Sequence, residues 1–416
     1  MMKKYALITI FITVFLDIFG FGIIIPLLPF YAQKFGANPL IIGLLMSSNS
    51  VAQFIFNPIW GRISDRYGRR PVMICTVFGS FLAYLLFGLS NSIWLLFLSR
   101  ILAGVTGATI GVAQSYIADL TTNKNRSKAL GQLGAAFALG FVFGPALSGI
   151  LANPKIYLLI TKYVIDVSYL AQYSYGMPGF IAAGLSFINL VMVFLFLPES
   201  SNIDKKLGKK AFDVEGFKKV IKHPEMRMLM IILCISMFST SNMFSTFALF
   251  LQTKFKYGVS QSSFLFAYFG ICTAVVQGLL VGRLVKRFNE IKLLCASTVA
   301  LTIGMFMMPY MPNIFCVLIA STVIFLGNGI MTPCLTSLIT QRAQESQIGV
   351  TLGVSQSLGS LARIVGPLWG GYIFYVGGYP YPYLTGGIFA IFAFFCSIKL
   401  VEMTDKFKNN DSLVQN

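Results

Sequence analysis

Long apolar runs, with charged residues held between them, are the dominant pattern of this chain. Twelve runs reach about 20 residues, the length that a helix needs to cross the hydrocarbon core of a membrane. They cover residues 6–30, 40–60, 72–90, 93–117, 129–151, 177–197, 228–251, 262–281, 291–311, 313–338, 348–372 and 384–401. The alternation of apolar and polar residues that marks a transmembrane β-barrel is absent. The pattern predicts an all-α polytopic membrane protein with twelve transmembrane helices.

Composition excludes a soluble globule. Of the 416 residues, 56% are hydrophobic and only 11% are charged, and the mean hydropathy is +0.76. A soluble domain usually carries about 25% charged residues. The chain therefore has too much apolar surface to fold in water alone.

The net charge of +18 is a signal of topology rather than of nucleic-acid binding. With the N-terminus placed inside, the inner segments hold 25 Lys and Arg and the outer segments hold 5. Such a bias over short loops is the positive-inside rule. We expect both termini to be cytoplasmic and the protein to be multi-pass.

The residues offer no enzyme chemistry, cofactor site or metal site. All seven cysteines fall inside apolar runs, without the spacing of metal ligands. No nucleophile–base pair and no Gly-x-x-x-x-Gly-Lys-Ser/Thr phosphate loop occurs. The single histidine, His223, lies in a basic linker, where an incidental position is a simpler explanation than a proton relay.

Two internal repeats divide the chain. The charged loop Gly61–Arg70 returns in weaker form at Gly282–Phe288, 221 positions later. The pair Gly144-Pro145 returns as Gly366-Pro367 at an offset of 222. Because the two offsets agree, we predict two pseudo-symmetric bundles of six helices, a known plan of transporters.

The repeats set the expected domains. The first bundle spans residues 1–198, a basic cytoplasmic linker spans 199–226, and the second bundle with a short cytoplasmic tail spans 227–416. One segment, 153–176, is too polar and too short for a clean span. Its tyrosines favour a helix that lies in the membrane interface on the outer side.

The loop of the first half resembles the signature between the second and third helices of the major facilitator superfamily. The matching positions are Gly61, Asp65, Arg66, Gly68, Arg69 and Arg70. The resemblance implies a cytoplasmic latch in which Arg69 faces Asp119 and Asp65 faces the start of a helix near Gly349. An anion such as Asp65 is favoured beside a helix N-terminus. The second copy has Lys286 in place of the aspartate, so we expect only the first loop to be a full latch.

Two further motifs resemble those of proton-coupled members of the superfamily. The fifth span carries a pattern associated there with antiporters rather than importers, formed by Gly140, Gly144, Pro145 and Gly149. Such small residues allow close helix packing. The fourth span carries Arg100, about 10 Å deep at ~1.5 Å rise per residue. A charge at that depth is expected to face the bundle interior, unless the side chain snorkels to the interface.

Asp17 is the single carboxylate deep in a conventional span, and its surroundings resemble the first helix of drug:proton antiporters of the tetracycline and multidrug type. Burial opposes a charge on this carboxylate, whereas a nearby Arg100 favours one. We therefore expect these two residues to couple proton movement to transport. The alternative is that Asp17 is a permanently ionised partner of Arg100.

The leading prediction is a proton-coupled antiporter of the bacterial inner (plasma) membrane that exports drug-like amphipathic compounds by alternating access. The alternatives are an exporter of a native metabolite, such as a sugar or siderophore, and a non-transporting membrane sensor. The expected partners are a small-molecule substrate, protons and the lipid bilayer, for a protein that acts as a monomer. The candidate cavity residues are Gln114, Ser239, Asn242, Asn328 and Arg363.

Overall fold

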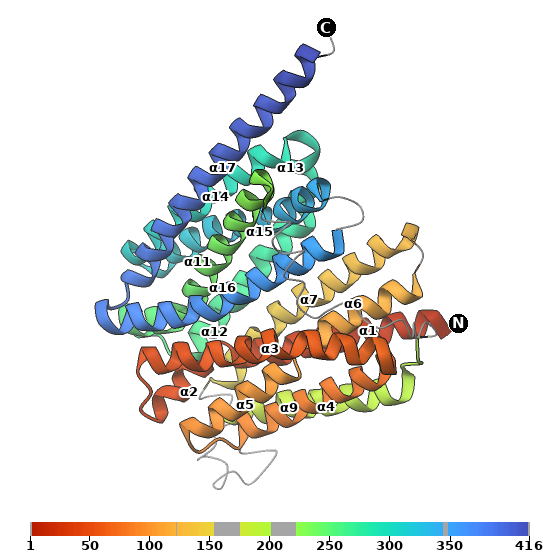
Figure 1. Ribbon diagram of the computed structural model, residues 1–416. Coiled ribbons are helices and arrows are strands. Elements are labelled where there is room, and N and C mark those ends of the chain that lie inside the picture. The colour runs from red at the N-terminus through yellow and green to blue at the C-terminus, as the bar shows by residue number, and fades with distance from the viewer. Residues whose placement is uncertain (1, 122, 154–174, 201–221, 344–347, 415–416) are drawn as a thin grey trace. The chain divides into compact units, whose positions relative to one another are not determined.

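The computed structural model describes residues 2–121, 123–153, 175–200, 222–343 and 348–414, which are mostly helical (Figure 1). No β-strand occurs within these residues, as the all-α prediction requires. The predicted interfacial helix at 153–176 lies outside the described residues except for its ends. Most of the linker at 199–226 also lies outside them.

The helices follow the predicted runs closely. Those of the first half are α1 (Met2–Ile24), α2 (Leu28–Lys34), α3 (Pro39–Tyr67), α4 (Arg69–Gly88), α5 (Ile93–Val105), α6 (Thr109–Leu120), α7 (Asn123–Leu151) and α9 (Met177–Phe196). Those of the second half are α11 (Pro224–Phe255), α12 (Val259–Val275), the π-helical turn η2 (Val276–Leu280), α13 (Val281–Arg287), α14 (Glu290–Met307), the 3₁₀ turn η3 (Met308–Tyr310), α15 (Ile314–Arg342), α16 (Ile348–Gly377) and α17 (Tyr381–Val414). The expected C-terminal tail is thus helical as far as Val414.

Within the described residues, eleven helical segments are long and apolar enough to cross a membrane. The helices α5 and α6 together make one of them, broken around Thr106 and Gly107. The remaining predicted span, residues 348–372, corresponds to α16, which has 30 residues and carries Gln356, Ser360 and Arg363 among its apolar side chains. The described helices are therefore those of a multi-pass membrane protein.

The internal repeat is visible in where the helices begin. The starts of α3, α4 and α5 recur 220 or 221 residues later as the starts of α12, α14 and α15. The side chain of Ser92 caps α5 by accepting a hydrogen bond from the Leu95 amide, and Asn313 caps α15 in the same way at the Cys316 amide. Short polar side chains at this position satisfy amides that have no partner inside the helix.

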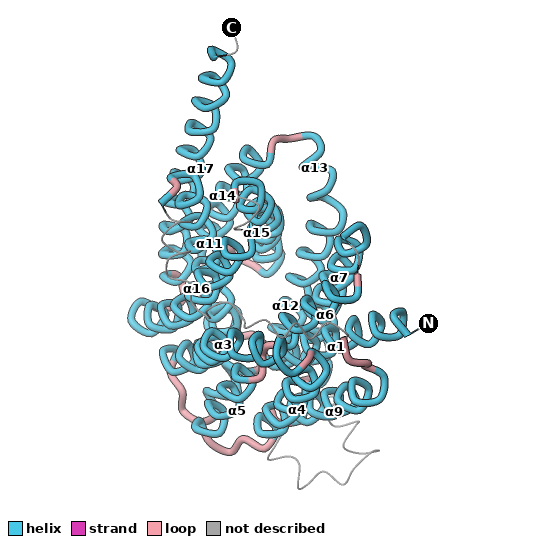
Figure 2. Tube along the Cα trace, turned by 45° about the vertical axis from the view of Figure 1, so that its right-hand side comes forward, coloured by secondary structure: helices cyan, strands magenta, loops and turns pink. Residues whose placement is uncertain are grey.

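The chain divides into two compact units, Met1–Ala211 with Leu251–Ile271, and Phe212–Phe250 with Cys272–Asn416. In the first unit α1 packs against α7 and α9, and α4 packs against α9; in the second unit α14 packs against α15 and α17 (Figure 2). The first part of α12 belongs to the first unit, where the Ser260 hydroxyl donates to the Gly149 carbonyl at 2.7 Å. The division into residues 1–198 and 227–416 remains a prediction about the repeat.

Candidate functional site

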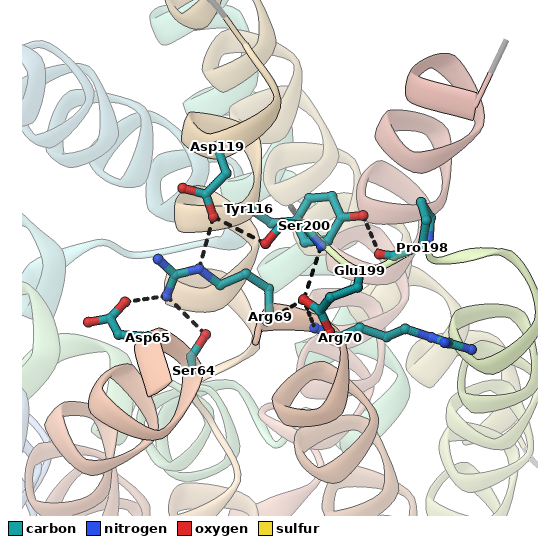
Figure 3. A network of polar contacts seen from close by, with 9 residues as sticks. All are labelled: Ser64, Asp65, Arg69, Arg70, Tyr116, Asp119, Pro198, Glu199 and Ser200. Atoms are coloured by element: carbon teal, nitrogen blue, oxygen red, sulfur yellow. Dashed lines mark hydrogen bonds and ion pairs between the residues drawn. The ribbon is translucent and has the colours of Figure 1, made fainter. Parts of the chain in front are cut away.

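The loop Gly61–Arg70 forms the junction between α3 and α4 (Figure 3). Gly68 separates the two helices with φ of +100°, a conformation that side chains rarely adopt. A Cβ added at Gly68 would lie 2.6 Å from the carboxyl carbon of Glu199. Glycine is therefore required there both for the backbone turn and for the close approach of a carboxylate.

Arg69 is the centre of the polar cluster in Figure 3. Its Nη1 lies 2.5 Å from Asp65 Oδ1, and its Nε lies 3.1 Å from Asp119 Oδ2. Nη1 also donates to the Ser64 hydroxyl at 3.0 Å. The predicted pairing of Arg69 with Asp119 is therefore present, and one guanidinium joins the end of α3, the start of α4 and the end of α6.

Glu199, which the sequence analysis missed, is the anion at the start of α4. Its Oε1 accepts hydrogen bonds from the amides of Arg69 at 2.8 Å and Arg70 at 3.4 Å. The first amides of a helix have no partner within the helix, and their dipoles favour a negative charge. The position expected for Asp65 is at the start of a different helix, near Gly349, and within the first unit its carboxylate pairs with Arg69. The available signal was an acidic residue directly after the sixth apolar run of a chain with few acids.

The remaining signature residues lie at the edge of the cluster. Arg70 extends away from it in Figure 3 and donates to the Phe194 carbonyl at 2.8 Å. Arg66 is exposed, with its guanidinium 5.3 Å from the centre of the Tyr67 ring. A Cβ added at Gly61 would meet no described atom within 4 Å. The predicted approach of Asp65 to Gly349 would join the two units and stays a prediction.

Asp17 lies within α1 and is half-buried. The Ser80 hydroxyl donates to its Oδ1 at 3.4 Å, and the Tyr84 hydroxyl donates to its backbone carbonyl at 3.3 Å. Gly20 leaves room for the tyrosine, since an added Cβ would lie 2.8 Å from the Tyr84 ring. Ser80 and Tyr84 are four residues apart on α4, so they share one helical face directed at α1. Sequence reasoning missed both, although this spacing was visible.

Arg100 is buried in α5, with 3% of its surface exposed. Its guanidinium lies 5.0 Å from the centre of the Phe87 ring, and its Nε donates to the Ser99 hydroxyl at 3.4 Å. Its Nη2 has no hydrogen-bond partner among the described residues. This burial argues against a side chain that snorkels to water.

Asp17 and Arg100 make no ion pair with each other in the described part of the chain. The predicted direct attraction is therefore absent from this conformation. Instead, Asp17 Oδ1 accepts a hydrogen bond from Ser80, and the guanidinium of Arg100 lies against the Phe87 ring.

The four residues of the antiporter pattern fasten α7 to its neighbours. A Cβ added at Gly140 would lie 2.9 Å from the Phe15 carbonyl oxygen, and one at Gly144 would lie 2.5 Å from the Phe19 carbonyl oxygen. These contacts lie on either side of Asp17 along α1. The Pro145 ring packs at Gly22 of α1, and Gly149 packs against α12. The pattern therefore sets how closely α7 holds the helix that carries the carboxylate.

The candidate cavity residues are placed differently from one another. Ser239 and Asn242 are fully buried and donate to the α17 carbonyls of Gly386 at 3.0 Å and Pro382 at 2.6 Å. This arrangement differs from the expected cavity lining, because both side chains are used in packing α11 on α17. Gln114 of α6 is exposed and Asn328 of α15 is half-buried.

The chain is similar to known transporters along almost its whole length. The profile of the Major Facilitator Superfamily matches residues 10–367 and 229–413. Multidrug resistance protein 1 of Bacillus subtilis (strain 168) is 29% identical over 392 residues, covering 92% of this chain and 94% of the relative. The class B tetracycline resistance protein of Escherichia coli is 30% identical over 400 residues, covering 94% and 93%. A crystal structure of a bacterial homologue of the human lysosomal transporter Spinster matches with a TM-score of 0.78 at 14% identity, covering 96% of this chain and 97% of that one.

Proposed function

We propose that this chain, which belongs to the major facilitator superfamily of membrane transporters and is not an enzyme, exports drug-like amphipathic compounds in exchange for protons. The family and its transport role follow from the matches over the whole chain. Exchange, proton coupling and cargo are the proposal. The relatives named for multidrug and tetracycline resistance support the class of cargo.

One observation carries the coupling: Asp17 is a half-buried carboxylate inside a transmembrane helix, with no cationic partner among the described residues. A carboxylate in such surroundings is a functional site by default, since a charge at that depth costs a few kcal/mol. The Ser80 hydroxyl, 3.4 Å from Asp17 Oδ1, stabilises the ionised form. Protonation removes the need for that bond.

The exchange then needs only that Asp17 alternates between a protonated and an ionised state. A proton from the outer side neutralises Asp17, and binding of cargo from the inner side favours its release. The buried charge of Arg100 and the hydroxyl of Tyr84 keep the region polar in both states. Close packing of α7 on α1 at Gly140 and Gly144 transmits the change at Asp17 to the helices that move.

The test uses purified protein in proteoliposomes with an imposed pH gradient and tetracycline or ethidium as cargo. We expect Asp17→Asn to abolish accumulation driven by the gradient, because a carboxamide, unlike a carboxyl group, neither gains nor loses a net proton at these pH values. The same variant is expected to retain exchange of cargo without a gradient, which shows that it is folded. The matched control is Glu402→Gln, which removes an exposed carboxylate near the end of α17 and is expected to leave accumulation unchanged. Gradient-driven accumulation by Asp17→Asn would falsify the coupling site.

We also propose that both termini are cytoplasmic in a bacterial inner membrane and that the protein acts as a monomer. The bias of Lys and Arg between the two sides supports the orientation. Tags placed at the C-terminus and within residues 153–176 are expected to be labelled from opposite sides of the membrane. Labelling of both tags from one side contradicts this topology.

The second candidate keeps the transport mechanism and changes the cargo to a native metabolite, such as a sugar or siderophore. Export of such a compound, with no transport of tetracycline or ethidium, would replace the drug proposal. A non-transporting sensor is disfavoured, because the named relatives over the full chain are resistance proteins.

A further inference from the structure

Arg363 places a positive charge near the middle of the 30-residue helix α16. A charge at the centre of a membrane costs about 2.5–3.5 kcal/mol on insertion scales and faces a bundle interior or water rather than lipid. The structure of the second unit shows which way this residue faces and what it contacts.

One face of α16 packs directly on α11. A Cβ added at Gly359 would lie 2.7 Å from the sulfur of Met237, and one at Gly366 would lie 2.9 Å from Ser241 Cβ. Such contacts leave no room for any side chain between the two helices. Arg363, four residues after Gly359 and three before Gly366, emerges along the edge of this contact.

A second face of α16 is apolar and uncovered in its unit. Val365 follows Leu361 by four residues, and Tyr372 follows Val365 by seven. The three side chains are 46% (Leu361), 43% (Val365) and 48% (Tyr372) exposed. Exposed apolar side chains in a transmembrane helix suit contact with lipid chains. We therefore expect lipid to cover this face.

The third face is polar and lies opposite the apolar one. Ser360 lies four residues after Gln356, and Arg363 lies seven residues after Gln356. The three side chains therefore form one stripe along the helix. Gln356 is exposed, and the other two are half-buried. A polar stripe on the side away from lipid is expected to line a path for water or cargo.

The guanidinium of Arg363 has only neutral partners. Its Nη2 donates to the Ser360 hydroxyl at 3.0 Å, and its Nη1 lies 3.6 Å from the Met237 sulfur. A guanidinium carries five N–H donors in a fixed fork that matches a carboxylate. The described part of the second unit offers no carboxylate within ion-pair distance of Arg363.

The three acidic residues of that unit whose side chains the structure describes are placed elsewhere. Glu225 and Glu290 lie in the first turns of α11 and α14, and Glu402 lies near the end of the apolar part of α17. Glu225 is already paired with Arg342 at 2.5 Å. Arg363 is thus a cation whose counter-charge is not supplied by the described residues of its own unit.

We propose that Arg363, with Ser360 and Gln356, binds an acidic group of the exported compound, a carboxylate or a comparable organic anion. The cargo class is then amphipathic molecules that carry an acid, whether or not they also carry a cation. This inference rests on the proposed export function but not on proton coupling at Asp17. Binding of a small inorganic anion is the competing explanation, which a matched pair of dyes separates.

The test measures equilibrium binding to purified full-length protein in detergent by fluorescence polarisation. The probes are rhodamine B, which has a free carboxylate, and its ethyl ester, which is otherwise the same molecule. We expect the wild-type protein to bind the acid about tenfold more tightly than the ester, the effect of one charged hydrogen bond. Arg363→Gln is expected to remove this preference, and Arg363→Lys to keep part of it.

The control is Arg283→Gln, which removes one exposed cation in α13 of the same unit. This change is expected to leave the preference for the acid over the ester intact. Equal affinity of the wild-type protein for acid and ester overturns the inference, as does a failure to bind the acid. A preference that survives in Arg363→Gln also overturns it. A site that accepts only small inorganic anions would give equal affinities for the acid and the ester, which is the same adverse result.

The two proposals fail separately. Asp17→Asn is expected to keep the acid-over-ester preference while losing gradient-driven accumulation. A wild-type protein that accumulates cargo but shows no preference keeps the export proposal and loses the anion site. A wild-type protein that prefers the acid but shows no proton-driven accumulation keeps the anion site and loses the coupling.

Discussion

The junction between α3 and α4 in the first unit and its repeat between α13 and α14 in the second begin their following helix at matching positions but carry opposite charges. In the first, the cation Arg69 lies between the carboxylates of Asp65 and Asp119. At the matching offsets of 221 and 222 the second unit has Glu290 and Gln341. Glu290 accepts hydrogen bonds from Gln341 at 3.1 Å and from the Ser337 hydroxyl at 2.9 Å.

The two junctions also join different helices. The cluster around Arg69 ties α3, α4 and α6 together, and Glu199 adds the segment after α9. The ion pair of the second unit is Arg342 with Glu225, which joins α15 to α11, and Arg342 also donates to Thr404 of α17 at 3.2 Å. In α13 no residue is buried, and Lys286 is exposed. The repeat therefore keeps helix boundaries while each unit has its own bonds, and among the described residues the cluster of an arginine between two carboxylates occurs at the first junction and not at the second.

The largest difference in stability between the two junctions is expected from Arg69→Ala. We expect the unfolding free energy to fall by about 3 kcal/mol, because the partly buried carboxylate of Asp119 and the exposed carboxylate of Asp65 lose the cation that they share. The matched change in the second junction is Arg287→Ala, at an exposed position, with an expected effect within about 0.5 kcal/mol. Thermal unfolding of both variants in the same detergent gives the measurement. Equal loss in the two variants would show that the junctions do not differ.

The next effect is expected at the turn itself. Gly68→Ala forces a side chain into φ of +100° and into the Glu199 carboxylate, at a cost of about 2 kcal/mol. Gly282→Ala is the control, since an added Cβ there meets no described atom within 4 Å and alanine favours a helix. We expect the control to be neutral or slightly stabilising in the same unfolding experiment. A destabilised Gly282→Ala together with an unaffected Gly68→Ala would show that glycine is needed at position 282 and not at position 68.

A smaller effect is expected from the charge that caps α4. Glu199→Gln keeps a side-chain oxygen as acceptor and loses the negative charge beside the helix N-terminus, so we expect a loss of about 1 kcal/mol. Because the group is near the surface, the loss is expected to shrink at high salt. Unfolding at low and high ionic strength checks both points. A loss that is the same at every salt concentration would point to packing instead of charge.

The smallest effect is expected from restoring the missing aspartate. Lys286→Asp recreates the signature in the second junction, but Glu290 stands where Arg69 stands in the first. With no arginine four residues on, we expect a change of no more than about 0.5 kcal/mol. Stabilisation well above that value would mean that the second loop has a cationic partner of its own. Thermal unfolding beside the wild-type protein decides this.

Parts of the candidate site could be predicted from the sequence, because their contacts join residues close along the chain or because few residues of that type were available. The turn at Gly68 and the i,i+4 pair Asp65–Arg69 lie within five residues. Asp17 was found because acids are rare inside the apolar runs. The pairing of Arg69 with Asp119 came through resemblance to a family, since 50 residues separate the two along the chain.

Other parts depended on contacts that no sequence pattern encodes. The bond from Ser80 to Asp17 and the carboxylate of Glu199 at α4 depend on how helices rotate and approach one another. Ser239 and Asn242 were expected to line a cavity, but the packing of α11 on α17 places them against the α17 backbone. The orientation of Arg363 was available in principle, because Gln356, Ser360 and Arg363 already have the spacing of one helical face.

The sequence by itself determined that this is a polytopic helical membrane protein built from a repeat, with one carboxylate deep in its first span. Hydrocarbon thickness, hydrogen-bonded backbones and the cost of buried charge act on each segment separately, so those features need no knowledge of neighbours. Only the tertiary structure decided that Asp17 is bonded by Ser80 while Arg100 lies against Phe87, that Glu199 caps α4, and that the start of α12 packs on α7. These depend on distances between segments far apart in the chain, which packing of whole helices sets.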